Sequence, residues 1–449
     1  MKHIVLIIML LLIASTIVRP DVAKAGESRP LLVWHTENDP ATQARFQAMG
    51  DVFQQETGRK VIYEYIPWGQ LSKRLFTALD ANDESMLPDI THLEPYMAYS
   101  LFEQSALVDI SDLVKTIDQK SKIRPQVRDL QLFHGRHYGI AQHVGVSFIL
   151  YREDHLDAIG ATPPRTWDDF FAVCARLKEG IKNRDYFPVT APGVSPFFME
   201  IVFNELLNSA GGKIVTGSPP TINLETPEVE RVLETIKRIA EFSSLTRFRR
   251  TEYLEQFKQL AAGEATFVMF AGARAFKALE EKEPGASPAK YRTLEPPAYG
   301  NSLPSFTSLD CEPFVIPQRQ DANRIKLSKK WIEMFFRHGY REFCESVPIQ
   351  LMPIFQELDS DYEKNPSVVK WRPWYDQAKS MISSDRAIPY FQQRGAPTEV
   401  DFLFAFHNRG VIHEMILDVV RGIDTRTAMK NAQEKALLIV RDGRRNHSP

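Results

Sequence analysis

The sequence predicts an α/β protein built as two large lobes. With 449 residues, 43% of them apolar, the chain is long enough for two or three domains, or for two lobes that each bury a core. Its first hundred residues alternate between short apolar runs and amphipathic helical patterns, which is typical of an open α/β sheet. This alternation breaks near residue 138, where a long extended stretch suggests a crossing between lobes.

The elements of the first half have clear start and stop signals. Asp39 and Pro40 offer an N-cap and a first-turn proline for a helix, and Gly58 is placed to end it. Leu71, Leu75 and Leu79 form one stripe of a second helix. The expected order is strand 31–34, a helix from 41 to Gly58, strand 61–66, helix 70–80 and a strand beginning at 88–91.

The second half is expected to be richer in helix. Thr166 can cap a helix, with Asp169 answering three residues later. Residues 283–310, rich in Pro, Ser and Gly, are predicted to be loop, and 441–449 a frayed polar tail. The other expected elements are an extended stretch over 138–151, mostly helix over 170–290 with a helix at 253–260 and a strand at 266–270, strand 314–316, helix 328–336, and helix 411–420 ending at Gly422.

Composition excludes several classes of protein. The 55 basic and 57 acidic residues nearly balance, which argues against a nucleic-acid binder. Ordinary globular composition excludes disorder and collagen. The three cysteines are far apart, which excludes a zinc knuckle, and leaves open either a Cys311–Cys344 bridge or buried free thiols.

The first 25 residues have the pattern of a secretory signal peptide. A short positive start precedes the apolar run 4–13, and 23–25 reads Ala-Lys-Ala before Gly26. The alternative is a membrane anchor, but the run is shorter than the roughly 20 residues that span a bilayer. We therefore expect an exported protein in the periplasm.

Motifs for catalysis and for cofactors are missing from the sequence. It contains no Gly-x-Ser-x-Gly, no His-Glu-x-x-His, no Walker loop, no Gly-x-Gly-x-x-Gly and no His/Cys cluster with metal spacing. The adjacent carboxylates at 168–169 and 280–281 would point in different directions on a helix. We expect no cofactor, no metal and no enzyme, although two distant carboxylates of a secreted glycosidase stay open as an alternative.

Aromatic residues at the ends of predicted elements suggest a sugar ligand. A flat ring beside hydrogen-bonding groups suits the C–H face and the hydroxyls of a saccharide. The simpler alternative for each ring is core packing. The rings in question are Trp34, Trp68, Tyr96, Phe197, Phe198, Trp371, Trp374 and Phe406.

Several short blocks, in order along the mature chain, resemble one family. Residues 87–90 read Leu-Pro-Asp-Ile, 150–154 read Leu-Tyr-Arg-Glu-Asp, 164–169 read Pro-Arg-Thr-Trp-Asp-Asp, and 262–268 read Ala-Gly-Glu-Ala-Thr-Phe-Val. With 138–140 and the segment after Gly422, they make the chain similar to the family 1 extracellular solute-binding proteins of ABC importers, the class that includes maltose-binding protein. Ala106 and Ala141 depart from the family's usual glycine and proline.

This resemblance implies a periplasmic binding protein fold of type II, with two α/β lobes joined by a hinge of crossing segments. It implies lobe one over 26–142 plus 313–345 and lobe two over 146–308 plus 350–449. The expected function is to bind a sugar or oligosaccharide in the interlobe cleft, as a monomer, and deliver it to the permease subunits of an ABC importer. Delivery to a membrane sensor is an alternative that the sequence does not separate from transport.

The resemblance also implies candidate ligand contacts, which are the residues at positions where members of this family contact their ligands. They are His35, Glu37, Asn38, Trp68, Glu94, Tyr96, Gln142, His143, Phe197, Arg274, Asp310 and Gln350. His143 has a structural role as its alternative. Arg274 stands where the family usually has an aromatic residue, which raises the alternative of an anionic polyol such as glycerol-3-phosphate. An ion pair from Arg274 to an acid of another segment is the simpler explanation.

Overall fold

The computed structural model describes residues 29–446, apart from 38, 68–69, 82, 95, 273 and 301–303. The predicted signal peptide and the candidates Asn38 and Trp68 lie outside the described residues. Within the part of the chain that is described, no helix is both long and apolar enough to cross a membrane.

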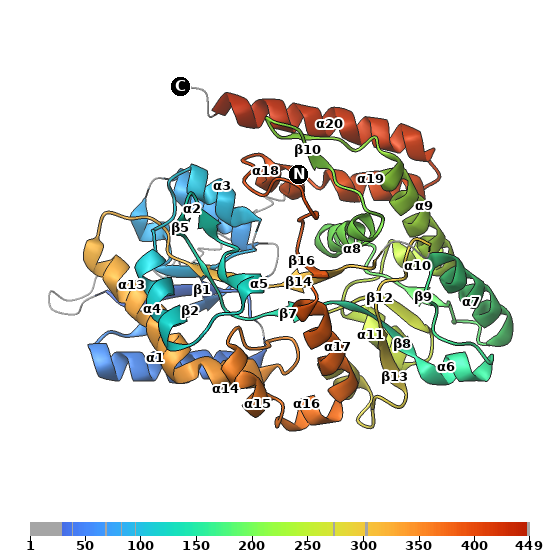
Figure 1. The fold of residues 1–449 in the computed structure, drawn as a ribbon, viewed down its shortest axis with the longest axis horizontal. Coiled ribbons are helices and arrows are strands. Elements are labelled where there is room, and N and C mark those ends of the chain that lie inside the picture. Colours follow the sequence, from blue (N-terminus) through green and yellow to red (C-terminus); the bar gives the residue numbers. More distant parts are fainter. Residues whose placement is uncertain are drawn as a thin grey trace, which may run out of the picture.

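One half of the molecule, here called lobe one, is built around a five-stranded sheet (Figure 1). The strand order is β2-β1-β3-β15-β6, with β1 parallel to β2 and β3, and β15 antiparallel to β3 and β6. The strands are β1 (Leu31–His35), β2 (Val61–Tyr65), β3 (Ile90–His92), β6 (Ile140–Ala141) and β15 (Pro313–Val315). The helices are α1 (Pro40–Thr57), α2 (Leu71–Asp80), α3 (Met97–Glu103), α4 (Ser111–Lys120), α5 (Pro125–Arg128), α13 (Ala322–Met334) and α14 (Tyr340–Ser346), with short helical turns at Glu84–Met86 and Phe335–Gly339 and a hairpin of β4 (Leu132–Phe133) and β5 (Arg136–His137).

The predicted signals at both ends of α1 are confirmed. The Asp39 side chain accepts hydrogen bonds from the N–H groups of Ala41 and Thr42, and Pro40 occupies the first helical position. Gly58 ends the helix with φ at 70°, a left-handed conformation that suits glycine. This cap also sets the path of the loop between β1 and α1, which carries Glu37.

The other half, lobe two, surrounds a four-stranded sheet in the order β13-β8-β12-β9 (Figure 1). Its strands are β8 (Phe148–Arg152), β9 (Val189–Thr190), β12 (Phe267–Ala271) and β13 (Tyr291–Leu294), and a small hairpin joins β10 (Val215–Thr216) to β11 (Thr221–Ile222). Its helices are α6 (Glu153–Ala158), α7 (Trp167–Gly180), α8 (Pro196–Ser209), α9 (Pro227–Phe242), α10 (Leu245–Phe248), α11 (Glu255–Ala261), α12 (Arg274–Lys282), α18 (Leu403–Asn408), α19 (Val411–Val420) and α20 (Thr425–Asn446).

Two predictions for lobe two need correction, and one is confirmed. The segment 283–310, predicted as loop, contains β13 and a further strand, β14, because sheet neighbours override its Pro and Ser content. The predicted tail is helical to Asn446, since α20 packs along α19. The capping box of Thr166 and Asp169 is confirmed.

A small sheet joins the two lobes. It has the order β16-β14-β7, with β7 (Gly145–Val146), β14 (Thr307–Asp310) and β16 (Ala387–Pro389) lying between the halves in Figure 1. The chain passes between lobes at β7 and again between β14 and β15. A third passage runs near Met352, which exchanges backbone hydrogen bonds with Val144 of 3.0 and 3.1 Å. It leads into α15 (Asp359–Tyr362), α16 (Pro366–Lys370) and α17 (Arg372–Ser383), after a helical turn at Gln356–Leu358.

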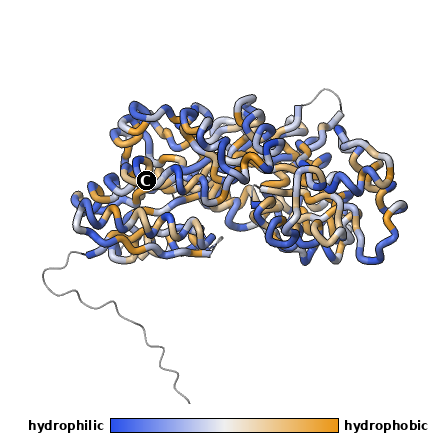
Figure 2. Tube along the Cα trace, turned by 90° about the horizontal axis from the view of Figure 1, so that it is seen from below, coloured by the Kyte–Doolittle hydropathy of each residue, from blue (hydrophilic) through white to orange (hydrophobic). Residues whose placement is uncertain are grey.

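Apolar segments gather inside both halves (Figure 2). Four of the aromatic residues proposed for sugar contact belong to these cores instead, because each is almost fully buried: Trp34, Trp371, Trp374 and Phe406. The three cysteines are free and buried, so Cys311 and Cys344 are not bridged. Core packing was the alternative for the four rings, and it is the one observed.

The joining sheet leaves no room for a side chain at Gly145. A Cβ atom at this position would lie 2.7 Å from the Gln350 backbone oxygen. We expect Gly145→Ala to lower the free energy of unfolding by about 1–3 kcal/mol, as overpacking usually does. Chemical denaturation measures this loss. Gly285→Ala is the matched control, since nothing lies within 4 Å of its Cβ, and equal stability of the two variants would contradict the prediction.

Candidate functional site

Polar side chains converge where β1 and β3 end and where the chain crosses between lobes. His35 closes β1, His92 closes β3, and Gln142 and His143 lie just before β7. Together with Glu37, Glu94 and Glu312 they are buried. Ligands of open α/β sheets bind at the carboxyl ends of the strands, so this is where a site is expected.

Backbone hydrogen bonds fix two stacked histidines in the neutral form. The Glu37 N–H donates to His35 Nδ1 (2.9 Å), and the Thr36 N–H donates to His92 Nε2 (3.0 Å). Each ring therefore carries its proton on the other nitrogen. His35 Nε2–H then donates to Gln142 Oε1 (3.0 Å), and His92 Nδ1 faces Glu312 Oε2 at 3.0 Å. The two rings stack 4.2 Å apart.

Burial keeps these imidazoles uncharged. Loss of solvent, aided by neighbouring histidines, lowers the pKa of His92 to about 3 and that of His35 well below its usual value. His143 behaves differently. Burial alone would lower its pKa, but the Asp310 carboxylate 3.3 Å from Nε2 outweighs burial and raises it. The His143–Asp310 pair links two of the crossing segments.

Two glutamates of the cluster are held in poorly solvated surroundings. Burial, followed by the charge of Asp310, raises the pKa of Glu312 to about 8. Burial also raises the pKa of Glu94, which is 3% exposed, to about 7. Oε2 of Glu94 has no hydrogen-bond partner. Near neutral pH these carboxyls are therefore poised between their charged and neutral forms.

Two ion pairs connect the lobes on one side of this cluster. Arg274, at the start of α12 in lobe two, donates to Glu37 of lobe one through Nη2 (2.5 and 2.6 Å). One turn later, Lys277 pairs with Asp39. Burial would raise the pKa of Glu37, but Arg274 outweighs it and lowers that pKa. The predicted alternative for Arg274, an ion pair with an acid of another segment, is the arrangement observed.

Aromatic rings from both lobes meet on the other side. Tyr96 of lobe one packs against Phe391 (centroids 4.7 Å apart) and His407 (5.2 Å) of lobe two. Phe197, at the start of α8, lies 5.4 Å from Phe391. An interlobe cavity of about 130 Å³ is lined by Tyr96, Phe391 and Gln393, among others.

Most of the described candidates fall into this interlobe region. His35, Glu37, Gln142, His143, Asp310 and Arg274 join the polar cluster, Glu94 and Tyr96 follow β3, and Phe197 joins the aromatic wall. Gln350 lies against Gly145, so its place is at the third passage between the lobes. Contact of any of these residues with a ligand stays a prediction.

The sequence interpretation missed other members of the region. His92, Tyr390, Phe391 and His407 were not among its candidates. The adjacent rings Tyr390 and Phe391 directly after a strand, followed by two glutamines, were the available signal. For His92 the signal was its position at the end of a strand parallel to β1.

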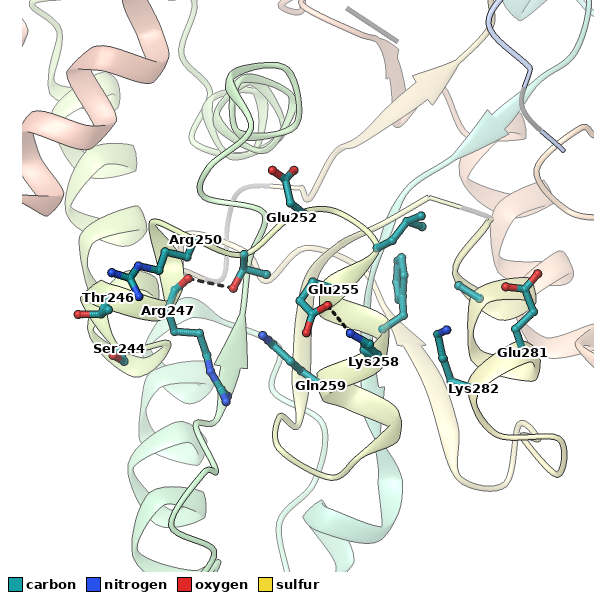
Figure 3. Close-up of a pocket in the computed structure, with 14 residues that line it drawn as sticks. Ser244, Thr246, Arg247, Arg250, Glu252, Glu255, Lys258, Gln259, Glu281 and Lys282 are labelled. Atoms are coloured by element: carbon teal, nitrogen blue, oxygen red, sulfur yellow. Dashed lines mark hydrogen bonds and ion pairs between the residues drawn. The ribbon is translucent and has the colours of Figure 1, made fainter. Parts of the chain in front are cut away.

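Two hollows on the outer surface differ from this region. One of about 820 Å³ lies over α10, α11 and α12 (Figure 3), where Glu252 and Glu281 lie on different sides of the hollow and point away from each other. Two of its basic residues pair with glutamates: Arg247 with Glu264 and Lys258 with Glu255, both at 3.0 Å. The other, of about 840 Å³, lies between β2 and α2. Among the described residues, no group of three or more His, Cys, Asp or Glu is arranged to hold a metal ion.

Comparisons with known proteins place the chain among solute-binding proteins. A family model described as bacterial extracellular solute-binding protein matches residues 48–367. An arabinooligosaccharide-binding protein of Bacillus subtilis (strain 168) is 25% identical over 181 residues, which are 39% of this chain and 41% of that protein. The chain thus spans about 41% of the length of that relative.

Solved structures share the fold at low identity. The GacH receptor of Streptomyces glaucescens, described unliganded and with acarbose, has a TM-score of 0.72 at 16% identity, covering 92% of this chain and 98% of that one. A Thermotoga lettingae solute-binding protein bound with α-D-tagatose has a TM-score of 0.72 at 17% identity, covering 92% and 100%. Maltose-bound MalE3 of T. maritima has a TM-score of 0.72 at 15% identity, covering 91% and 99%. They establish the two-lobed fold.

Breaking the ion pair between the lobes should destabilise the protein. Arg274→Met leaves the Glu37 carboxylate, which is 4% exposed, buried without its cation. We expect a loss of about 3 kcal/mol in the free energy of unfolding, of which the double variant Glu37→Gln/Arg274→Met recovers at least half. Denaturation curves of the double-mutant cycle measure this. The control Arg372→Met breaks exposed pairs with Asp376 and Glu363 and should leave the free energy of unfolding close to that of wild type. A loss for Arg274→Met no larger than the control's would refute a structural role.

The raised pKa of Glu312 predicts how stability depends on pH. Between pH 4.5, the ordinary pKa of a glutamate, and about pH 8, its pKa in the folded protein, the folded state holds a proton on Glu312 that the unfolded state releases. Stability from this group therefore falls as pH rises through that window, by at most about 1.4 kcal/mol per pH unit. Glu312→Gln, which does not titrate, should gain stability relative to wild type as pH rises from 5 to 8. Parallel stability curves for the two proteins would contradict the shift.

Proposed function

Because the chain belongs to the family of bacterial extracellular solute-binding proteins, we propose that it binds a sugar or oligosaccharide between its lobes and delivers it to the permease subunits of an ABC importer. We propose further that it is exported to the periplasm through a cleaved signal peptide, acts as a monomer and releases its ligand unchanged, without enzymatic activity. The lobe boundaries proposed from sequence, 26–142 plus 313–345 and 146–308 plus 350–449, belong to the same proposal.

One observation carries the choice of a sugar: hydrogen-bonding groups and aromatic rings from both lobes meet at the interlobe region. Glu94 and Gln393 each present a buried oxygen that has no donor. Tyr96, Phe197 and Phe391 supply apolar faces nearby. Buried acceptors beside flat rings suit a molecule whose edge carries hydroxyls and whose face carries C–H groups.

The similar proteins support the same ligand class. The relative from Bacillus subtilis is named for arabinooligosaccharides, and the structures with the same fold are described with acarbose, tagatose or maltose. An anionic polyol is less favoured by this chain, because Arg274, on which that alternative depended, already neutralises Glu37.

Ligand entry requires the lobes to separate. The interlobe cavity of about 130 Å³ is smaller than the roughly 300–1,000 Å³ of typical ligand pockets. The ion pairs Glu37–Arg274 and Asp39–Lys277 hold the lobes together in this structure. Separation would break them and would bend the strands of the joining sheet, so binding shifts a population of open and closed states.

A saccharide that binds should raise the melting temperature of the mature protein. At 100 times its Kd, one ligand stabilises the folded state by about 2.7 kcal/mol. The panel comprises arabinose and glucose oligosaccharides, maltose, tagatose, polyols and glycerol-3-phosphate. Thermal shift identifies hits, and sugar analysis after incubation checks for cleavage. Absence of any saccharide shift together with cleavage of a glycan would overturn the proposal in favour of an enzyme.

A matched pair of variants places the site for any hit. Tyr96→Ala removes a ring of the interlobe wall and should weaken binding at least tenfold. Phe187→Ala removes a half-buried ring of lobe two that packs under Arg247, away from the interlobe region, and should leave affinity within twofold. Equal affinity of both variants would move the site elsewhere.

A further inference from the structure

Two acceptor oxygens of the interlobe region are buried and have no donor. Oε2 of Glu94 and Oε1 of Gln393 have no hydrogen-bond partner, and the side chains are 3% and 4% exposed. They come from different lobes, Glu94 from the loop after β3 and Gln393 from the segment after β16. Unpaired buried acceptors are costly, so a ligand that donates hydrogen bonds to both would remove that cost.

The orientation of Gln393 is set by its neighbours. Its Nε2 donates to the Phe391 carbonyl oxygen (3.2 Å) and to Asn204 Oδ1. Both partners are oxygens that accept, so the amide nitrogen must face them and the amide oxygen is left over. Gln393 also lines the interlobe cavity together with Tyr96. The unpaired atom of Gln393 is therefore its amide oxygen, a hydrogen-bond acceptor.

The charges around the cluster leave the carboxyls of Glu94 and Glu312 in excess. Arg274 pairs with Glu37, Lys277 with Asp39, and His143 with Asp310. Glu312 faces His92, whose imidazole is neutral. The charge of Glu312 adds to burial in raising the pKa of Glu94. An acidic, acceptor-rich space is unfavourable for an anion and favourable for a cation.

We propose that the preferred sugar is an amino sugar, whose ammonium group binds between Glu94 and Gln393 beside the ring of Tyr96. This inference rests on the proposed sugar binding and narrows its ligand class. An ammonium has three N–H donors and no acceptor, so it matches oxygens that lack donors. The ammonium donates a charge-assisted hydrogen bond to the Glu94 carboxylate and makes a cation–π contact with the ring of Tyr96.

The test compares sugars that differ only in carrying amines in place of hydroxyls, one in each monosaccharide and two in the disaccharide. Glucosamine with glucose, galactosamine with galactose, mannosamine with mannose, and chitobiose with cellobiose are titrated into the mature protein at pH 7. We expect at least one amine to bind ten or more times tighter than its hydroxyl counterpart. N,N′-diacetylchitobiose, which lacks the charge, should lose that advantage.

Variants assign the preference to the named residues. Glu94→Gln keeps the shape of the side chain and removes its charge, and should reduce affinity for the amino sugar at least ten times more than affinity for its hydroxyl counterpart. Glu312→Gln is a second variant, expected to reduce the same preference, should Glu94→Gln not fold. Glu179→Gln, exposed on the outer helix α7, is the matched control and should change nothing.

Proton release gives an independent readout. The titratable or charged groups around Glu94 and Glu312 are Glu94 and Tyr96 after β3, Glu37 after β1, His92, His143, Asp310 and Glu312 at the crossings, Tyr253 and Arg274 in lobe two, Glu200 and Glu205 on α8, and Tyr390 and His407 after β16. Since burial raises the pKa of Glu94 and Glu312 to about 7 and 8, both hold protons near pH 7. A bound ammonium should expel part of them, so titration in buffers of different ionisation enthalpy should show release for amines only.

Three outcomes would overturn the inference. Hydroxyl sugars that bind as tightly as their amine counterparts would leave sugar binding intact and remove the amine preference. Equal losses of both ligands in Glu94→Gln would do the same. If no saccharide in this set or in the thermal-shift panel binds, the proposed function itself fails, and the amine preference with it.

Discussion

The arrangement of the molecule depends on keeping charged groups compensated in the space between its lobes. Glu37 follows β1 in lobe one, and its carboxylate is buried only because Arg274 reaches it from lobe two. One turn further along α12, Lys277 forms a second ion pair between the lobes, with Asp39. Because a buried charge without a partner is costly, each lobe completes the electrostatics of the other. Contact between the lobes is thus tied to the same loops that carry the candidate site.

Periodicity and end signals predicted much of the fold. Asp39, Pro40 and Gly58 bound α1 because capping is local chemistry that a few residues determine. Residues 283–310 failed because β13 is a strand only through its pairing with β8, and nothing in its own Pro- and Ser-rich surroundings indicates that partner. Chain length and the extended stretch near residue 138 suggested two lobes with one crossing between them, and the family resemblance indicated the other joining segments.

The sequence predicted individual residues of the candidate site but did not predict which of them pair with each other. The family resemblance identified Glu37, Glu94 and Tyr96, all of which follow strands, and the carboxyl ends of parallel strands share one edge of the sheet. The sequence did not reveal that Arg274 pairs with Glu37, since the two residues are 237 positions apart on the chain and only the approach of the two lobes brings them together. Trp371 and Trp374 show the opposite outcome: the sequence suggested that these rings contact a ligand, but in the structure they are buried in the core.

The central claim is that a sugar is bound between the lobes by Glu94, Tyr96 and the rings that face them. A crystal structure of the mature protein with its tightest-binding saccharide tests this most directly. The account predicts density for the sugar between the loops after β1 and β3 and the segment around Phe391, within hydrogen-bond distance of Glu94. Density confined to an outer hollow, such as the one over α10–α12 in Figure 3, with an unoccupied interlobe region, would contradict it.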